Sequence, residues 1–447
     1  MRLYQKKQCL ETITLLGEAH GEIAGLIKEK KFGNAQKLLE KCQQSAICMG
    51  TLVETAEGEG TRVVRYLEEY CELVYQLYVE LSSGALVDVA QLKKKLQKQL
   101  IKTVDSLIQD ITTEQEAVFL PYKASMWDSL ESVWKAAAEA PCCTALVIPI
   151  PYYDRNPDGS FGEMHYEADL FPDSVPVIPY NAYDFEACHP DMIFIHNPYD
   201  DKNYVTSVSP FFYSENLKKY TDELVYIPYF VQDEIDPSDE AAVQAMEHFC
   251  TAPGVVNADH VVVQSEAMRQ VYVNVLTKYT GEYLCSYWEK KVLGLGSPKF
   301  DRVRGLRGED FPIPDYWKTL IQKEAGGRKK VIFYNTTVSA ILQSGEAMLD
   351  KIERVLCMFR EESGEVVLLW RPHPLMEATL ASMRPHLLER YRRIVEEYKA
   401  AGWGIYDDSA DLDRAIAVSD GYYGDMSSVV WLYRETGKPV MIQIAEY

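Results

Sequence analysis

The first 120 residues carry apolar positions that recur every three to four residues, the period of an amphipathic helix. Val63, Leu67, Val74 and Leu81 show this spacing most clearly. Short polar breaks at 28–33 and 57–60 separate the helical stretches, as in an antiparallel bundle. We therefore expect residues 1–120 to form a helical bundle domain.

From about residue 140 the pattern changes to short apolar runs that alternate with amphipathic helices. Runs of strand length that are apolar on both faces are typical of parallel strands covered by helices. The runs are TALVIPIPY, DMIFIHNPY, ELVYIPYFV, ADHVVVQS, VLGLGSP, KKVIFYNTT, EVVLLWRPHP, GYYGD and KPVMIQ. Their alternation with helices predicts right-handed β-α-β units. The expected fold is α/β, with two Rossmann-like lobes preceded by an all-α helical domain.

A stretch rich in Gly, Pro and charge, RGLRGEDFPIP at 304–314, lies just before a new strand. We take it as the boundary between the two lobes. The predicted domains are then a helical bundle at 1–120, an N-terminal acceptor lobe at 121–308 and a C-terminal nucleotide-binding lobe at 309–447. Ligands of such folds bind outside the carboxyl ends of the strands, so the loops there are where chemistry is expected.

Charge and cysteine content narrow the class of protein. The 46 Lys and Arg against 67 Asp and Glu give a net charge of −21, which argues against nucleic-acid binding because that requires a basic footprint. Residues 121–310 alone carry −16 of this charge, so we expect them to repel a long polyanion. The ten cysteines show no C-x-x-C pair or metal-ligand spacing. Free thiols and the lack of a signal-like apolar run predict a cytoplasmic protein.

The segment LKKKLQKQLIKTVDSLIQDI at 92–111 is strongly amphipathic. Its polar side carries Lys93, Lys94, Lys95, Lys98 and Lys102. A solvated helix face is the plainer interpretation. The alternative is a helix that contacts either the inner face of the membrane or a partner protein.

Two polar stretches follow strands of the predicted C-terminal lobe. The turn R-P-H-P after EVVLLW places the Arg371 guanidinium and the His373 imidazole at the mouth of the sheet. A satisfied turn histidine would explain His373 equally well. Three further polar loops, HNPYDD at 196–201, GLGSPKFD at 294–301 and YNTTVS at 334–339, are expected at the same end of their strands.

The second stretch is SDGYYGDMSS at 419–428. A strand is expected to end near Asp420, with a turn leading to Asp425 and a helix opening at Ser427 and Ser428. Paired hydroxyls and free backbone N–H groups at a helix N-terminus suit an anion. A simple helix cap by Asp425 or Ser427 uses the same geometry, so both interpretations stay open.

Together, A-D-H-V-V-V-Q-S, G-x-G-S-P-K-F-D, Y-N-T-T, R-P-H-P and S-D-x4-D-x-S-S-x8-G-K-P resemble the CDP-glycerol glycerophosphotransferase family of teichoic-acid polymerases and primases. The resemblance covers roughly residues 190–443. It implies a GT-B architecture, with the nucleotide in the C-terminal lobe, and a part in cell-wall biogenesis. It also implies no cofactor and no metal, the nucleotide-diphosphate donor being a CDP-linked substrate.

The resemblance implies roles for individual residues. His196 would be the general base, because a neutral imidazole suits removal of a hydroxyl proton near pH 7. The second catalytic histidine would be His373. The implied donor-diphosphate residues are Arg371, Ser427, Ser428, Asp425, Thr336 and Thr337. The implied nucleotide-binding residues are Ser297, Lys299 and Asp420.

The predicted function is transfer of glycerol phosphate, or a similar polyol phosphate, from a CDP-activated donor to an acceptor hydroxyl by in-line displacement. The partners are thus a nucleotide-activated donor and a neutral or cationic acceptor rather than a long polyanion. One alternative is a GT-B glycosyltransferase or nucleotide-sugar epimerase with a UDP-type donor. The other is a degenerate, non-catalytic scaffold of the same fold.

Overall fold

The computed structural model describes residues 1–83, 88–156, 158–323, 326–409 and 411–443. Contacts divide the chain into two compact units. The first unit contains residues 1–122, 134–195 and 203–224, and the second contains 123–133, 196–202 and 225–447.

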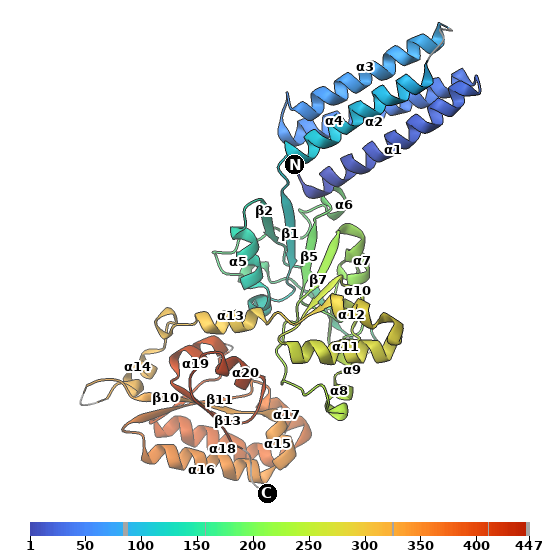
Figure 1. Ribbon diagram of the computed structural model, residues 1–447. Helices are drawn as coiled ribbons and strands as arrows, with labels where there is room; N and C mark the ends of the chain where they lie inside the picture. The colour runs from blue at the N-terminus through green and yellow to red at the C-terminus, as the bar shows by residue number, and fades with distance from the viewer. Residues whose placement is uncertain (84–87, 157, 324–325, 410, 444–447) are drawn as a thin grey trace. The chain divides into compact units, whose positions relative to one another are not determined.

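Four long helices open the first unit: α1 (Leu3–Lys28), α2 (Phe32–Glu57), α3 (Arg62–Ser82) and α4 (Val89–Gln109). They form an antiparallel bundle (Figure 1), in which α1 and α3 each pack against α2 and α4. The apolar positions with helical spacing, among them Val63, Leu67 and Val74, fill a core of their own. The helical character expected from the sequence is confirmed. Among the described residues, no helix has the length and apolar character needed to cross a membrane.

The first unit also contains strands and short helices. Parallel pairing of β1 (Gln115–Leu120) with β2 (Cys143–Val147) and β5 (Met192–Ile195) gives the order β2-β1-β5. A small antiparallel sheet has the order β4-β3-β6, formed by β3 (Tyr152–Arg155), β4 (Phe161–His165) and β6 (Thr206–Val208). The expectation of helix up to residue 120 is wrong for Gln115–Leu120, because its last four residues are buried as a sheet strand. The short helices are α5 (Glu131–Glu139, which begins in the second unit), α6 (Phe185–Cys188) and α7 (Ser214–Leu217).

The last two residues of β7 (Glu223–Tyr226) belong to the second unit. This strand pairs in parallel with β8 (His260–Val262), which pairs with β9 (Val292–Leu293). The accompanying helices are α8 (Glu240–Ala245), α9 (Glu247–Cys250), α10 (Pro253–Asn257), α11 (Glu266–Thr280), α12 (Cys285–Lys291) and α13 (Pro298–Gly305).

A five-stranded parallel sheet forms the rest of the second unit, in the order β12-β11-β10-β13-β14. Its strands are β10 (Lys330–Thr336), β11 (Val366–Pro372), β12 (Ile405–Tyr406), β13 (Gly421–Gly424) and β14 (Val440–Ile442). Its helices are α14 (Asp315–Ile321), α15 (Val338–Ser344), α16 (Glu346–Glu361), α17 (Met376–Met383), α18 (Pro385–Ala401), α19 (Leu412–Val418) and α20 (Ser428–Arg434).

Helices cover both faces of this sheet, with α16 and α18 on one face and α19 and α20 on the other (Figure 1). Successive strand residues therefore enter different cores: Phe333 packs with α19 and α20, and Tyr334 with α16 and α18. Burial on both faces explains why the strands read as continuous apolar runs. The α/β fold with parallel sheets behind a helical region is confirmed.

All nine apolar runs contain a strand. One boundary is wrong, however. The strand expected to end near Asp420 begins immediately after it, at Gly421. Asp420 therefore lies at the amino end of the sheet, where its backbone N–H donates to Val331 O at the start of β10.

Candidate active site

The carboxyl ends of β10, β11 and β13 meet at one edge of the C-terminal sheet. In the parallel register Asn335 lies opposite both Arg371 and Gly424. The His373 N–H donates to Thr336 O at 2.9 Å, and the Asp425 N–H donates to Asn335 O at 3.0 Å. Three predicted loops are thus joined by backbone hydrogen bonds.

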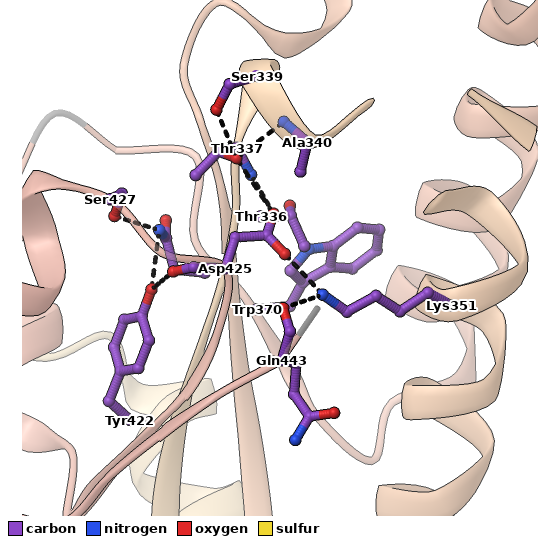
Figure 2. A network of polar contacts seen from close by, with 11 residues as sticks. Thr336, Thr337, Ser339, Ala340, Lys351, Trp370, Tyr422, Asp425, Ser427 and Gln443 are labelled. Carbon is purple, nitrogen blue, oxygen red and sulfur yellow. Dashed lines mark hydrogen bonds and ion pairs between the residues drawn. The ribbon is translucent and has the colours of Figure 1, made fainter. Parts of the chain in front are cut away.

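Asp425 is the centre of a buried polar network, which Figure 2 shows. Its carboxylate accepts from the Thr337 N–H at 2.7 Å and forms an ion pair with Lys351 Nζ at 2.7 Å. Lys351 also donates to Gln443 O at 2.7 Å, so one ammonium joins α16, the loop after β13 and the residue after β14. Sequence reasoning missed Lys351. Its place on the apolar face of α16, three residues after Met348 and four before Val355, was the available signal.

Ser427 and Ser428 lie where α20 begins. Ser427 is the N-cap residue, but its side chain makes no capping hydrogen bond. Its hydroxyl accepts from Asn335 Nδ2 at 3.2 Å instead. Asn335 also donates to the hydroxyl of Tyr422, whose pKa is raised to about 12 by burial. The side-chain cap that would have explained this pattern is therefore not formed, and Ser428 stays exposed at the first helical position.

The two threonines after β10 differ in what their hydroxyls do. Thr336 is fully buried, and its hydroxyl accepts from Trp370 Nε1 at 3.2 Å. Thr337 caps α15 by accepting from the Ala340 N–H at 3.2 Å, and its hydroxyl lies 3.2 Å from Asp425. Both hydroxyls thus have structural partners, so the diphosphate contact expected of them stays a prediction.

Arg371 is buried, and its guanidinium donates to Asp407 at 2.8 Å. Asp407 also lies 3.3 Å from the guanidinium of Arg414. An anion near Arg371 would therefore meet a cation that already has a carboxylate partner. Asp407 was not anticipated. Its signal was the polar run DDS at 407–409, directly after the short strand β12.

His373 is exposed at the end of β11. Its Nδ1 accepts the Leu375 N–H at 3.1 Å, which requires that nitrogen to be unprotonated. Partial burial and the neighbouring Arg371 charge lower the pKa of His373, which also favours the neutral ring. The ring proton then sits on Nε2 and can be donated to a ligand.

A pocket of about 370 Å³ lies beside His373. Its walls come from α17, α18 and the segment after β12, and its size is that of a small-ligand site. The side chains that line it are Pro372, His373, Pro374, Met376, Glu377, Tyr391, Arg392, Val395, Glu396, Lys399, Tyr406, Asp408 and Ser409.

His196 belongs to a second cluster in the same unit, built with Ser129, Asp128 and Lys299. The imidazole is fully buried, and its Nδ1 lies 2.9 Å from Ser129 Oγ. Burial, with the nearby Lys299 charge as a smaller cause, lowers the pKa of His196 to about 3. Lys299 itself forms an ion pair with Asp128. His196 and Lys299, predicted for different roles, are therefore neighbours.

The remaining predicted nucleotide residues, Ser297 and Asp420, are not in the loops after β10, β11 and β13. Ser297 is the N-cap of α13, where its hydroxyl accepts from the Lys299 N–H at 3.3 Å. The Asp420 carboxylate pairs with Arg328 at 2.7 Å and accepts from the Val331 N–H at 2.8 Å, at the opposite end of the strands from His373. Nucleotide binding by Ser297, Lys299 and Asp420 stays a prediction.

One group could hold a metal ion within the described ranges: Asp154, Glu163 and His165, on β3 and β4 of the first unit. Their ligand atoms all lie within 4.8 Å of one another, and His165 Nε2 is 3.0 Å from an Asp154 oxygen. A divalent cation would suit this mixed donor set. The expectation that the transfer chemistry uses no metal stays a prediction.

No protein-family model matches the chain, and no curated protein matches it. Similar solved structures include the S. aureus MnaA–UDP co-structure, at 12% identity and a TM-score of 0.42 over 73% of this chain and 78% of that one. A UDP-N-acetylglucosamine 2-epimerase matches at 11% identity and a TM-score of 0.46, over 75% and 80%. A variant of the wall teichoic acid polymerase TagF matches at 13% identity and 0.38, over 86% and 79%. At these identities and TM-scores the similarities carry no argument about what this chain does.

Proposed function

We propose that this chain is a metal-independent transferase that moves glycerol phosphate, or a similar polyol phosphate, from a CDP-activated donor to an acceptor hydroxyl. The observation that supports the proposal is the convergence of neutral hydrogen-bond donors at the ends of β11 and β13. His373 offers Nε2–H, and Ser427 and Ser428 offer hydroxyls that no capping bond occupies. Donors fixed before the reaction are what stabilises charge that develops on a leaving phosphate.

The pocket beside His373 has the chemistry for the nucleoside half of such a donor. Tyr406 supplies aromatic surface for a flat base, whereas Tyr391, which also lines the pocket, is buried. Lys399 lies 4.1 Å above the Tyr406 ring, which adds a cation next to the aromatic wall. Asp408 and Glu396 can accept hydrogen bonds from ribose hydroxyls or from the amino group of cytosine.

In the proposed reaction the oxygen of the acceptor hydroxyl attacks the phosphorus that carries the polyol. A new P–O bond forms, the P–O bond to CMP breaks, and CMP leaves with the electron pair. His373, Ser427 and Ser428 would stabilise the leaving phosphate. The charge of −16 over residues 121–310 favours a neutral or cationic acceptor.

The proton of the acceptor hydroxyl would pass to His196. Ser129 donates its own proton to Met126 O at 2.7 Å, and its oxygen lies 2.9 Å from His196 Nδ1. A pKa of about 3 makes this a weak base, and the ring has no exposed surface. The role therefore requires the acceptor to open the packing around the ring.

Ligand binding tests the donor class. A thermal-shift series with CDP-glycerol, CDP-ribitol, CMP, CDP and UDP-sugars should show stabilisation by the cytidine ligands, about 2.7 kcal/mol for a ligand at 100 times its Kd. Stabilisation by UDP-sugars alone would overturn the CDP assignment and favour the glycosyltransferase or epimerase alternative. No shift with any nucleotide would contradict both transferase assignments and favour a scaffold.

Variants test the site. His373→Ala should weaken the CDP-glycerol shift and lower the rate of CMP release from CDP-glycerol, because the Nε2–H donor is lost. His386→Ala is the matched control, since His386 is an exposed histidine on α18 of the same lobe. Equal effects of the two changes would contradict the assignment of His373.

A further inference from the structure

The helical bundle carries an open apolar groove of about 350 Å³ between α2 and α3. Its floor contains Ala46, Gly50, Val64 and Leu67, and the absence of a side chain at Gly50 keeps it open. At one end, Ile47 and Tyr75 are 49% and 54% exposed, so this end presents apolar surface to solvent.

Acidic side chains line the rim of the groove. Glu54 from α2 and Glu68 and Glu72 from α3 line it. Within the described part of the chain none of the three forms an ion pair. A groove with an apolar end and an acidic rim fits an amphipathic helix that carries basic and apolar residues in matching order.

The exposed side of α4 is such a helix. Lys94, Lys98 and Ile101 follow one another along one stripe, at the helical spacing of four and then three residues. Ile101 is 54% exposed, and neither lysine has an ion-pair partner among the residues that the structure describes. These lysines belong to the lysine-rich face of α4, which neither packs in the bundle core nor takes part in the proposed transferase reaction.

The two surfaces match in spacing and in direction. Glu68, Glu72 and Tyr75 on α3 repeat the interval of Lys94, Lys98 and Ile101 on α4, four residues and then three. At 1.5 Å per residue, both sets span about 10 Å. With α4 of one molecule lying parallel to α3 of another, each lysine meets a glutamate and Ile101 meets the apolar end at Tyr75.

We propose that the α2–α3 groove binds the Lys94–Lys98–Ile101 stripe of a second copy of this chain. The groove and the stripe are different surfaces, so the contact is head-to-tail. A head-to-tail contact that does not close into a ring leaves a free groove at one end and a free stripe at the other. The association is therefore open, and its size grows with protein concentration.

Charge reversal on each surface gives a sharp test by sedimentation velocity of the full chain. Wild type should associate in a concentration-dependent way at low salt and less at high salt, because the pairs are exposed. Glu68→Lys with Glu72→Lys, and separately Lys94→Glu with Lys98→Glu, should each weaken association by roughly tenfold or more. An equimolar mixture of the two double variants should recover association. The native stripe of one variant meets the native groove of the other, and the reversed groove and reversed stripe are again opposite in charge.

Filling the groove provides a test without charge changes. Gly50→Leu adds a side chain where the nearest atom to a new Cβ is 4.0 Å away, so the bundle should fold and the association should be lost. Gly17→Leu, an exposed helical glycine on α1, is the control. A wild type that stays monomeric at low salt and high concentration would overturn the proposal. So would a mixture of the two double variants that associates no better than either variant alone, or binding to anionic vesicles in place of self-association.

Discussion

At the scale of single residues, the candidate site depends on a buried ion pair. Lys351 and Asp425 are 5% and 3% exposed, and together they hold α16, the loop after β13 and the chain after β14. A buried pair contributes little net stability, but loss of one partner leaves the other charged and unpaired in the interior.

Lys351→Met should therefore destabilise the protein by about 3–5 kcal/mol, measured by urea unfolding followed by tryptophan fluorescence. The double variant Lys351→Met with Asp425→Asn should recover part of that loss. Lys330→Met, which removes an exposed lysine 3.4 Å from Asp420, is the control and should cost no more than about 1 kcal/mol. A single variant as stable as the control would contradict the structural role of the pair.

Two buried tyrosines of the same lobe provide a matched pair. The Tyr334 hydroxyl has no hydrogen-bond partner in the part of the chain that the structure describes, whereas the Tyr398 hydroxyl donates to Leu368 O at 2.7 Å. Tyr334→Phe should therefore raise the free energy of unfolding by about 1 kcal/mol or leave it unchanged. Tyr398→Phe should lower it by about 1 kcal/mol, because a buried carbonyl loses its donor. Urea unfolding compares them, and the opposite order would show that the Tyr334 hydroxyl has a partner.

The residues of the site divide by how they can be found in a sequence. His373 and Ser427 lie in loops after apolar strands, where a polar side chain has no packing role. The alternation of apolar runs and polar loops was therefore enough to indicate them. Lys351 and Asp407 could not be found as easily, because they act as counter-charges. What each one pairs with is set by residues about 74 and 36 positions away.

At the scale of elements, the close approach of β13 to β10 requires a glycine. A Cβ on Gly424 would lie 2.3 Å from Asn335 O and 2.8 Å from Asn335 N, both backbone atoms that cannot move without breaking the sheet. Gly424→Ala should displace the Asp425 loop, lower the thermal midpoint and weaken the CDP-glycerol shift. Gly364→Ala, where nothing lies within 4 Å, is the control and should leave both unchanged. A Gly424 variant with an unchanged midpoint would show that the strands separate freely.

Strands that are buried on both faces could be predicted from the sequence, whereas strands that are largely exposed could not. Strands such as Val366–Pro372 are apolar on both faces because helices cover both, so their sequence identified them. The strands Tyr152–Arg155 and Phe161–His165 lie in a small antiparallel sheet and are largely unburied, which leaves no apolar run to recognise. Gln115–Leu120 was absorbed into the helical region because its apolar part is only four residues long.

At the scale of the whole molecule, the helical period and the two-faced apolar runs indicated a helical region followed by parallel α/β structure. The grouping of segments into compact units did not follow from composition. Residues 123–133 and 196–202 group with 225–447 through long-range contacts, and no local pattern encodes such contacts. The domain bounds at 120 and 308 stay a prediction.

Two buried histidines should make the stability of the whole chain depend on pH. Burial, with Lys93 as a smaller cause, lowers the pKa of His20 to about 4, and the pKa of His196 is lowered to about 3. In the unfolded chain both should titrate near 6.5. The unfolded state therefore binds more protons below pH 6.5, and stability that is fully present above that pH is lost as the pH falls toward 4 and 3. Each group contributes roughly 3 kcal/mol or more over that range.

The two contributions can be separated because all seven tryptophans lie beyond residue 120. Tryptophan fluorescence therefore follows the α/β part, whereas far-UV circular dichroism also follows the bundle. His196→Gln should reduce the fall in stability between pH 7 and 5 seen by fluorescence. His20→Gln, which can keep the contact with the Tyr70 hydroxyl, should reduce the fall seen by circular dichroism. His386→Gln should change neither, because that ring is exposed. A pH profile identical in all three variants would mean that both rings can bind protons in the folded chain, and the buried, neutral His196 invoked for the acceptor site would then be wrong.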